Sequence, residues 1–242
     1  FHVNFAVGNP GGRVVGIDNV SILTGPAFEL PTPYPAAALD RLKWTQSADV
    51  LYLAHPDYPP MKLSRAGAFE WSLTRIVFTD GPYLPVAKEG TLSASATTGI
   101  AVTVSSDIAL FAASDVGRPL RLRHGSTWGW GVITAVANAQ SATVEVHSAF
   151  GGTGAATEYR LGAWSGSTGF PSCVSFFEER LFFGGTRNRP QTVWGSVVGD
   201  YENHAPSQAD GDVLDDSAVT FTIADDRVNA IRWMSAGKRL AI

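Results

Sequence analysis

Short alternations of apolar and polar residues, typical of β-strands, recur along the whole chain. Val3, Phe5 and Val7 open the first of them, and residues 1–24 are predicted to form a hairpin around a turn at 9–12. Further strand-like runs are listed here in chain order: 50–53, 61–63, 69–78, 100–104, 120–122, 132–136 and 144–146. No convincing helical pattern of ten or more residues is present, so the sequence predicts an all-β protein.

Changes in composition divide the chain into five segments. Residues 1–24 form the terminal hairpin, and residues 25–48 are a Pro-rich linker that leads into a first blade strand. Residues 49–85 are a first blade-like segment, rich in aromatic residues. Residues 86–163 are rich in Ala, Thr, Ser and Gly and predict an inserted small β domain. Residues 164–242 are again rich in aromatic residues and are read as a second, truncated blade-like segment. Both ends lie inside strand patterns, so we expect this chain to be a piece of a longer polypeptide.

One strand–loop–strand pattern occurs more than once. The run Leu51-Tyr52-Leu53 matches Leu181-Phe182-Phe183, 130 residues later, and at the same offset Pro60 falls on Pro190. A third start, Lys238 to Ile242, resembles Glu179 to Phe183. Repeated units of this kind predict β-propeller-like blades, with residues 86–163 inserted between two of them; chance similarity between hairpins is the alternative.

The matching strand positions predict a set of core residues. Alternate residues of a strand share a face, so those on the inner face should be buried together. The predicted core residues are Leu51, Leu53, Leu181, Phe183, Phe221, Ile223 and Trp233.

Charge and cysteine content exclude several classes of function. The 242-residue chain has a net charge of −4 and a pI near 5.7, which disfavours a general nucleic-acid binder. Cys173 is the one cysteine, so neither an internal disulfide nor a cysteine metal cluster can form. The five histidines are scattered, and no zinc motif, phosphate-binding loop or nucleophile elbow is present. We therefore expect no metal, no cofactor and no enzymatic activity.

Acidic and aromatic clusters are the remaining candidate sites. Glu178-Glu179 and Asp215-Asp216 are adjacent carboxylates, which in a strand would point to opposite faces and so would not share a catalytic site. Trp128 and Trp130 flank Gly129 on one face of a predicted strand, where they could stack on a sugar or pack in an interface.

The segment from Asp200 to Asp226 is strongly acidic, and residues 204–217 lack sustained alternation, which predicts a loop. Its Asp210-Gly211-Asp212 run, with the two aspartates that follow it, could also bind a cation such as calcium, although the spacing misses the EF-hand pattern. Four of its residues are the candidates for a functional acidic surface: Asp210, Asp212, Asp215 and Asp216.

Three stretches resemble a known family. The segment L-K-W-T-Q-S-A-D-V-L-Y-L-A-H-P at 42–56 is similar to the blade opening of tail nozzle proteins of short-tailed bacteriophages, also called tail tubular protein B. Residues 176–203, with F-F-E-E-R-L-F-F-G-G-T and G-D-Y-E-N, and residues 216–233, with F-T-I-A-D-D-R-V-N-A-I-R-W, extend the resemblance to roughly half of the chain. The hairpin at 1–24 resembles the last strands of jelly-roll carbohydrate-binding modules.

This resemblance implies a structural component of the virion tail. A nozzle protein would associate with itself in a ring, expected to be a hexamer, that closes and then guides the channel for double-stranded DNA without binding it specifically. In such a ring the four candidate aspartates would face the channel, with a solvated outer loop as the alternative. It would also contact other tail proteins, such as an adaptor ring and fibres. The first alternative is a carbohydrate-binding tail adhesin that contacts host-surface polysaccharide, and the second is a tail-associated depolymerase.

Overall fold

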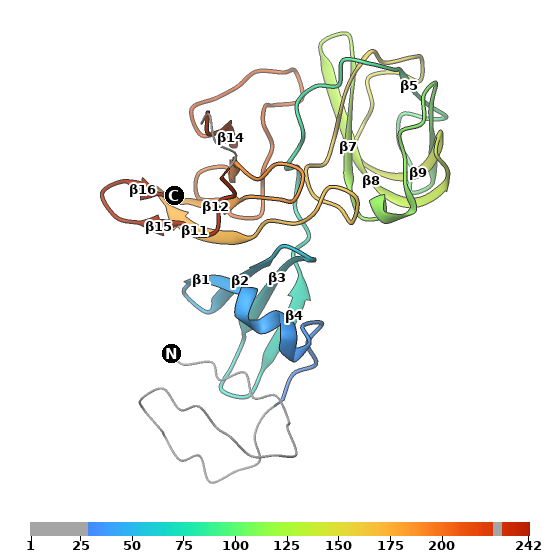
Figure 1. Ribbon diagram of the computed structural model, residues 1–242. Helices are drawn as coiled ribbons and strands as arrows, with labels where there is room; N and C mark the ends of the chain where they lie inside the picture. Colours follow the sequence, from blue (N-terminus) through green and yellow to red (C-terminus); the bar gives the residue numbers. More distant parts are fainter. Residues whose placement is uncertain (1–28, 225–228) are drawn as a thin grey trace, which may run out of the picture.

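Strands make up nearly all of the regular structure (Figure 1). The computed structural model describes residues 29–224 and 229–242. In these ranges the longer helix is the 3₁₀-helix η1, Ala36–Arg41, and the other is η2, Ala113–Asp115. The predicted all-β class is confirmed. The predicted hairpin at 1–24 lies outside the described residues.

The first sheet is a four-stranded antiparallel meander, drawn in blue to cyan in Figure 1. Its strands, in their order across the sheet, are β1 (Lys43–Ser47), β2 (Val50–His55), β3 (Tyr58–Arg65) and β4 (Trp71–Arg75). Strand β1 lies within residues 25–48, so the sheet begins earlier than the predicted boundary at 49. Strand β1 lies at the edge of the sheet, where a strand need not bury one of its faces. Its sequence K-W-T-Q-S accordingly shows no alternation of buried residues, and Trp44 is 58% exposed.

The second sheet repeats the first. Its strands, again in order across the sheet, are β11 (Cys173–Phe177), β12 (Arg180–Gly184), β13 (Thr192–Gly195) and β14 (Val219–Thr222). Lys43 pairs with Ala54 in the first sheet, and Cys173 pairs with Gly184, each 130 residues later, in the second. The turn residues Ala48 and Glu178, at the same offset, both have positive φ, 48° and 45°. The sequence repeat is therefore a repeat of strand order and, in the first hairpin of each sheet, of pairing register. The next strand pairs differ in register, because Leu63 pairs with Leu51 whereas Val193 pairs with Gly184.

The two sheets pack against each other through a shared core. Tyr52 and Ala54 of β2 join Leu181 and Phe183 of β12 and Trp194 of β13 in one buried cluster. A second cluster covers the opposite face of the second sheet, and its members are Cys173, Phe182, Val193 and Ile231, with Met234 and Leu240 packed against them. Strands β15 (Ser235–Ala236) and β16 (Leu240–Ala241) form a short hairpin. Leu240 belongs to this hairpin, and Met234 immediately precedes it. Apolar packing thus continues through three layers.

A third sheet of six strands forms between the two repeats in the chain, drawn in green to yellow in Figure 1. Its strands are β5 (Leu92–Ala94), β6 (Val102–Ser106), β7 (Pro119–His124), β8 (Thr127–Asn138), β9 (Ser141–Ser148) and β10 (Glu158–Leu161). They hydrogen-bond in the order β10-β7-β8-β9-β6-β5, and none of them pairs with a strand of the other sheets. A separate apolar cluster, which includes Leu120, Leu122 and Ile133, fills its concave side.

Four of the seven predicted core residues are buried, and two are not. Leu51, Leu53, Leu181 and Phe183 are buried. Ile223 is only partly buried. The prediction was wrong for the other two: Phe221 is 42% and Trp233 is 55% exposed. Phe221 lies on β14, an edge strand with all four residues exposed, and Trp233 lies outside any strand, so neither has a neighbouring strand on both sides to cover it.

Candidate functional site

The acidic segment forms an ordered loop between β13 and β14. Residues 205–217 contain no strand, in agreement with the prediction of a loop. The side chains of all four candidate aspartates are exposed, and these are Asp210, Asp212, Asp215 and Asp216. The Asp210 carboxylate accepts a hydrogen bond from the backbone N–H of Asp212, at 3.0 Å, which shapes the tip of the loop. The loop therefore presents carboxylates to solvent from a defined backbone.

Arg180, on β12, holds the C-terminal end of this loop. Its guanidinium is buried and donates to the backbone carbonyls of Asp215, Asp216 and Ser217, at 2.9, 3.2 and 2.7 Å. It also donates to the carbonyl of Ser196, at 2.6 Å, at the end of β13. Since five donors fan out from one planar group, a single arginine can tie the loop to its sheet. The motif E-R-L-F-F at 179–183 thus carries the anchor of the acidic loop.

The other part of the loop rests on the outer face of the six-stranded sheet. Arg121 on β7 donates to the carbonyls of Ser207 and Gln208, at 3.1 and 2.8 Å. The backbone N–H of Trp128 donates to the carbonyl of Ala209, at 2.6 Å. The loop is consequently held on both sides, by the second sheet and by the inserted one.

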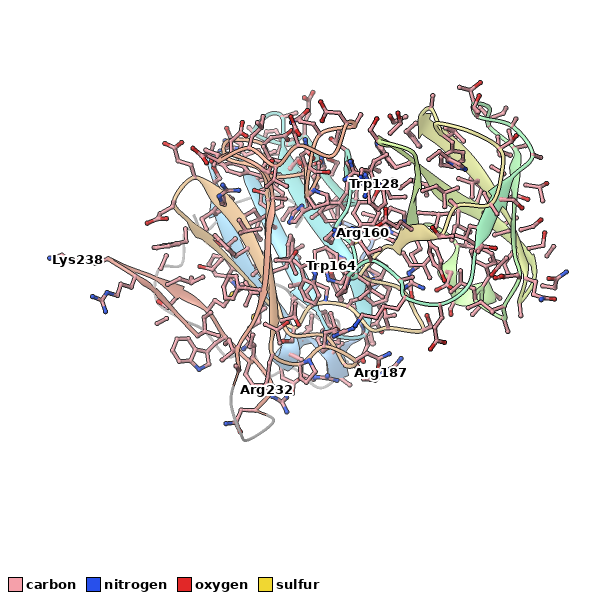
Figure 2. All side chains as sticks on the ribbon, turned by 90° about the horizontal axis from the view of Figure 1, so that it is seen from above. Trp128, Arg160, Trp164, Arg187, Arg232 and Lys238 are labelled. Atoms are coloured by element: carbon pink, nitrogen blue, oxygen red, sulfur yellow. The ribbon has the colours of Figure 1, made fainter. Side chains whose placement is uncertain are left out.

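Three arginines surround Trp128 on that face. The guanidiniums of Arg121, Arg123 and Arg160 lie 5.3, 5.8 and 5.7 Å from its ring centroid. Arg123 also pairs with Glu158, at 2.7 Å, while burial lowers the pKa of Arg160. Figure 2 shows Trp128 and Arg160 at the boundary between the inserted sheet and the two-sheet body. The indole is thus enclosed by cations and by the loop, an arrangement of the cation–π type.

The two predicted tryptophans do not form one open stacking platform. Trp128 is buried, at 7% exposure, so its ring is not available to a flat ligand. Trp130 is half-buried, and its ring lies parallel to that of His147, with centroids 4.8 Å apart and an interplanar angle of 7°. Interface packing therefore describes Trp128, and only Trp130 keeps an accessible indole.

The structure places the adjacent carboxylates in a turn and in a loop. Glu178 and Glu179 occupy the two-residue turn between β11 and β12, where both have positive φ and exposed side chains. They are therefore turn residues, whereas the sequence argument placed them in a strand. Asp215 and Asp216 lie in the loop, where their carbonyls, not their carboxylates, contact Arg180.

A cavity of about 270 Å³ lies between the loop and the inserted sheet, with both polar and apolar groups in its lining. Arg121, Trp128 and Trp130 line it from the sheet, and Asp80 and Asn203 line it from the connecting segments. Asp80 is buried, accepts a hydrogen bond of 2.5 Å from the hydroxyl of Tyr83, and has its pKa raised by burial.

Sequence reasoning missed Asp80 and Arg121. The alternation Leu120-Arg121-Leu122-Arg123 did contain a signal, because it places two arginines on the face opposite the buried leucines.

A buried histidine lies close to the cavity but inside the core. His204 is 2% exposed and is surrounded by the rings of Phe78, Trp164 and Phe183, with centroids 5.2 to 6.0 Å away. Neither of its ring nitrogens has a hydrogen-bond partner among the described residues. Burial lowers the pKa of His204 to about 3. The imidazole therefore stays neutral at physiological pH.

Within the ranges that the structure describes, no group of three or more His, Cys, Asp or Glu side chains is arranged to hold a metal ion. Cys173 is buried, and burial raises the pKa of its thiol to about 12. None of the described helices is both long and apolar enough to cross a bilayer.

No family model matches the sequence, and no curated protein matches it significantly.

Proposed function

We propose that this chain is a structural component of a short-tailed bacteriophage tail, part of the nozzle ring that closes and guides the DNA channel. The observation that carries the proposal is the pair of four-stranded sheets that share strand order, share the register of their first hairpins at a 130-residue offset, and pack through one core. We infer that they are blades of a β-propeller, with the hairpin β15–β16 in the position of a following blade. The segments that resemble nozzle proteins, 42–56 and 176–203, are those that build the matching hairpins.

A radial stack of blades suits a ring that must bear load. Each blade is covered on both faces by its neighbours, so few strand edges remain open to uncontrolled pairing. A head-to-tail interface between copies closes into a ring when its rotation divides the circle evenly. In such a ring, short loops between strands face the lumen or the rim, where they can vary without disturbing the core.

The acidic loop is the feature that we assign to the lumen. Exposed carboxylates repel the phosphates of DNA, so a collar of such loops would let the duplex slide without binding it. The two arginine anchors keep the loop backbone in place, as a channel wall requires.

Electron microscopy of the intact particle tests the proposal directly. The chain should trace into a closed ring at the distal end of the tail, with residues 205–217 at the lumen. A trace into a fibre, a monomer outside the tail, or no trace in the particle would refute the assignment.

Removal of the loop charges tests its role in the channel. The fourfold variant Asp210→Asn, Asp212→Asn, Asp215→Asn and Asp216→Asn should assemble normally, because these side chains are exposed and asparagine at 210 keeps the acceptor for the Asp212 N–H. We expect slower DNA release at low salt and a smaller difference at physiological salt, where charges are screened over about 8 Å. Release is measured by dye fluorescence from purified particles.

The matched control removes four exposed carboxylates elsewhere: Glu70→Gln, Glu89→Gln, Glu178→Gln and Glu179→Gln. This variant has the same net charge but should release DNA at the wild-type rate. Equal release rates for the two variants would contradict a lumenal role for the loop.

A further inference from the structure

The cavity beneath the acidic loop has the composition of a ligand site. Arg121 comes from β7, Trp128 and Trp130 come from β8, and Ser148 ends β9, so one wall is a rigid sheet. The opposite wall is formed by connecting segments, whose lining residues include Thr79, Asp80, Asn203, Gln208 and Asp216. The lining combines apolar surface, including an indole, with charged groups, amides and hydroxyls, which is the mixture found in small-molecule sites.

Two buried charged groups give this cavity fixed hydrogen-bonding walls. Arg121 is 2% and Asp80 is 8% exposed. The guanidinium is oriented by its bonds to two loop carbonyls, and its Nε has no partner among the described residues. The Asp80 carboxylate is oriented by the hydroxyl of Tyr83. A preorganised donor and a preorganised acceptor therefore line the same small space.

The mixture of groups selects the class of ligand. A sugar hydroxyl both donates and accepts, so one sugar can bond to a guanidinium, a carboxylate and an amide at once. The C–H face of a sugar ring packs on an indole, which Trp130 supplies. A simple anion would be repelled by Asp80 and Asp216, and the volume of about 270 Å³ lies just below the range of about 300–1,000 Å³ typical of drug-sized ligands.

We propose that this cavity is a saccharide-binding subsite in which Trp130 packs on the sugar ring while Arg121, Asp80, Asn203 and Gln208 bond its hydroxyls. The site goes beyond the ring role proposed above and does not depend on it. Saccharide binding is tested on the purified chain, outside any ring. A negative result would therefore refute the saccharide site and leave the ring assignment unchanged.

Saturation-transfer NMR on the purified full chain tests the proposal. The probes are the methyl glycosides of glucose, galactose, N-acetylglucosamine and glucuronic acid, with acetate as a simple anion. At least one glycoside should bind. Trp130→Ala should weaken that binding about tenfold, equivalent to about 1.4 kcal/mol, and Trp130→Phe should restore part of it. Gln208→Ala, which truncates an exposed side chain at the rim, should weaken binding without affecting the fold.

Trp44→Ala is the matched control, because Trp44 is an exposed tryptophan on β1 and does not line the cavity. It should leave the affinity unchanged. The proposal is overturned if no glycoside binds to the wild-type chain. It is equally overturned if binding survives both Trp130→Ala and Gln208→Ala, or if acetate binds as well as the best glycoside.

Discussion

Phe183→Ala should destabilise the protein by about 3–5 kcal/mol, the range for removing a large aromatic side chain from a core that cannot collapse. Phe183 is fully buried on β12, between the two sheets. Its ring contacts those of Trp164 and Phe78, with centroids 5.0 and 6.2 Å away, and both partners are held by other segments. The loss is measured by urea unfolding followed by tryptophan fluorescence.

Phe69→Ala provides the comparison for this variant. Phe69 is 78% exposed, so the same truncation should change the free energy of unfolding by no more than about 0.5 kcal/mol. If the two variants lost similar amounts, the interface between the repeated sheets would not be the main core of this part of the chain.

The second large effect is a loss of stability in acid caused by His204. Burial lowers the pKa of this histidine from its ordinary value of 6.5 to about 3. As pH falls below 6.5, the histidine is protonated in the unfolded chain but stays neutral in the folded chain. The free energy of unfolding therefore decreases progressively from pH 6.5 toward pH 3. Each pH unit in this window costs up to about 1.4 kcal/mol for one such group.

His204→Phe should flatten this pH dependence. A phenyl ring fits the aromatic surroundings of Phe78, Trp164 and Phe183 and cannot be protonated. Urea midpoints measured from pH 7 to pH 4 should therefore fall less steeply in the variant. Some slope should remain, because His55 is a second buried histidine whose pKa is lowered by burial.

His147→Gln, which changes an exposed histidine, is the control for this series. It should retain the wild-type slope. An unchanged slope in His204→Phe would show that His204 takes up its proton as readily in the folded chain as in the unfolded one.

Local pattern was sufficient to predict the class of fold and the existence of the repeat. Strand periodicity is set by residues that are near one another in sequence, and the match between Leu51 and Leu181 compares two such local patterns. The structure forms both hairpins, β1–β2 and β11–β12, with the same pairing register. The loop at 205–217 was also predictable, since its glycine, proline and clustered aspartates do not suit a strand. The sequence pattern did not predict burial or strand position correctly for the edge strands of the sheets. Strand β1 has no apolar alternation, and Phe221 does have an apolar neighbour pattern yet lies on an exposed edge strand.

The candidate sites were settled only by tertiary packing. Trp128 and Trp130 share a face of β8, but whether either is open to a ligand depends on the loop, which comes from residues about 80 positions later and covers only Trp128. The burial of Asp80, Arg121 and His204 likewise results from contacts between segments that are distant in sequence. Sequence by itself determined the central strands, their repeat and the charge of the loop. Only the tertiary structure decided which polar groups lie in a cavity, because burial is a property of the neighbours that the fold brings together and not of the residue itself.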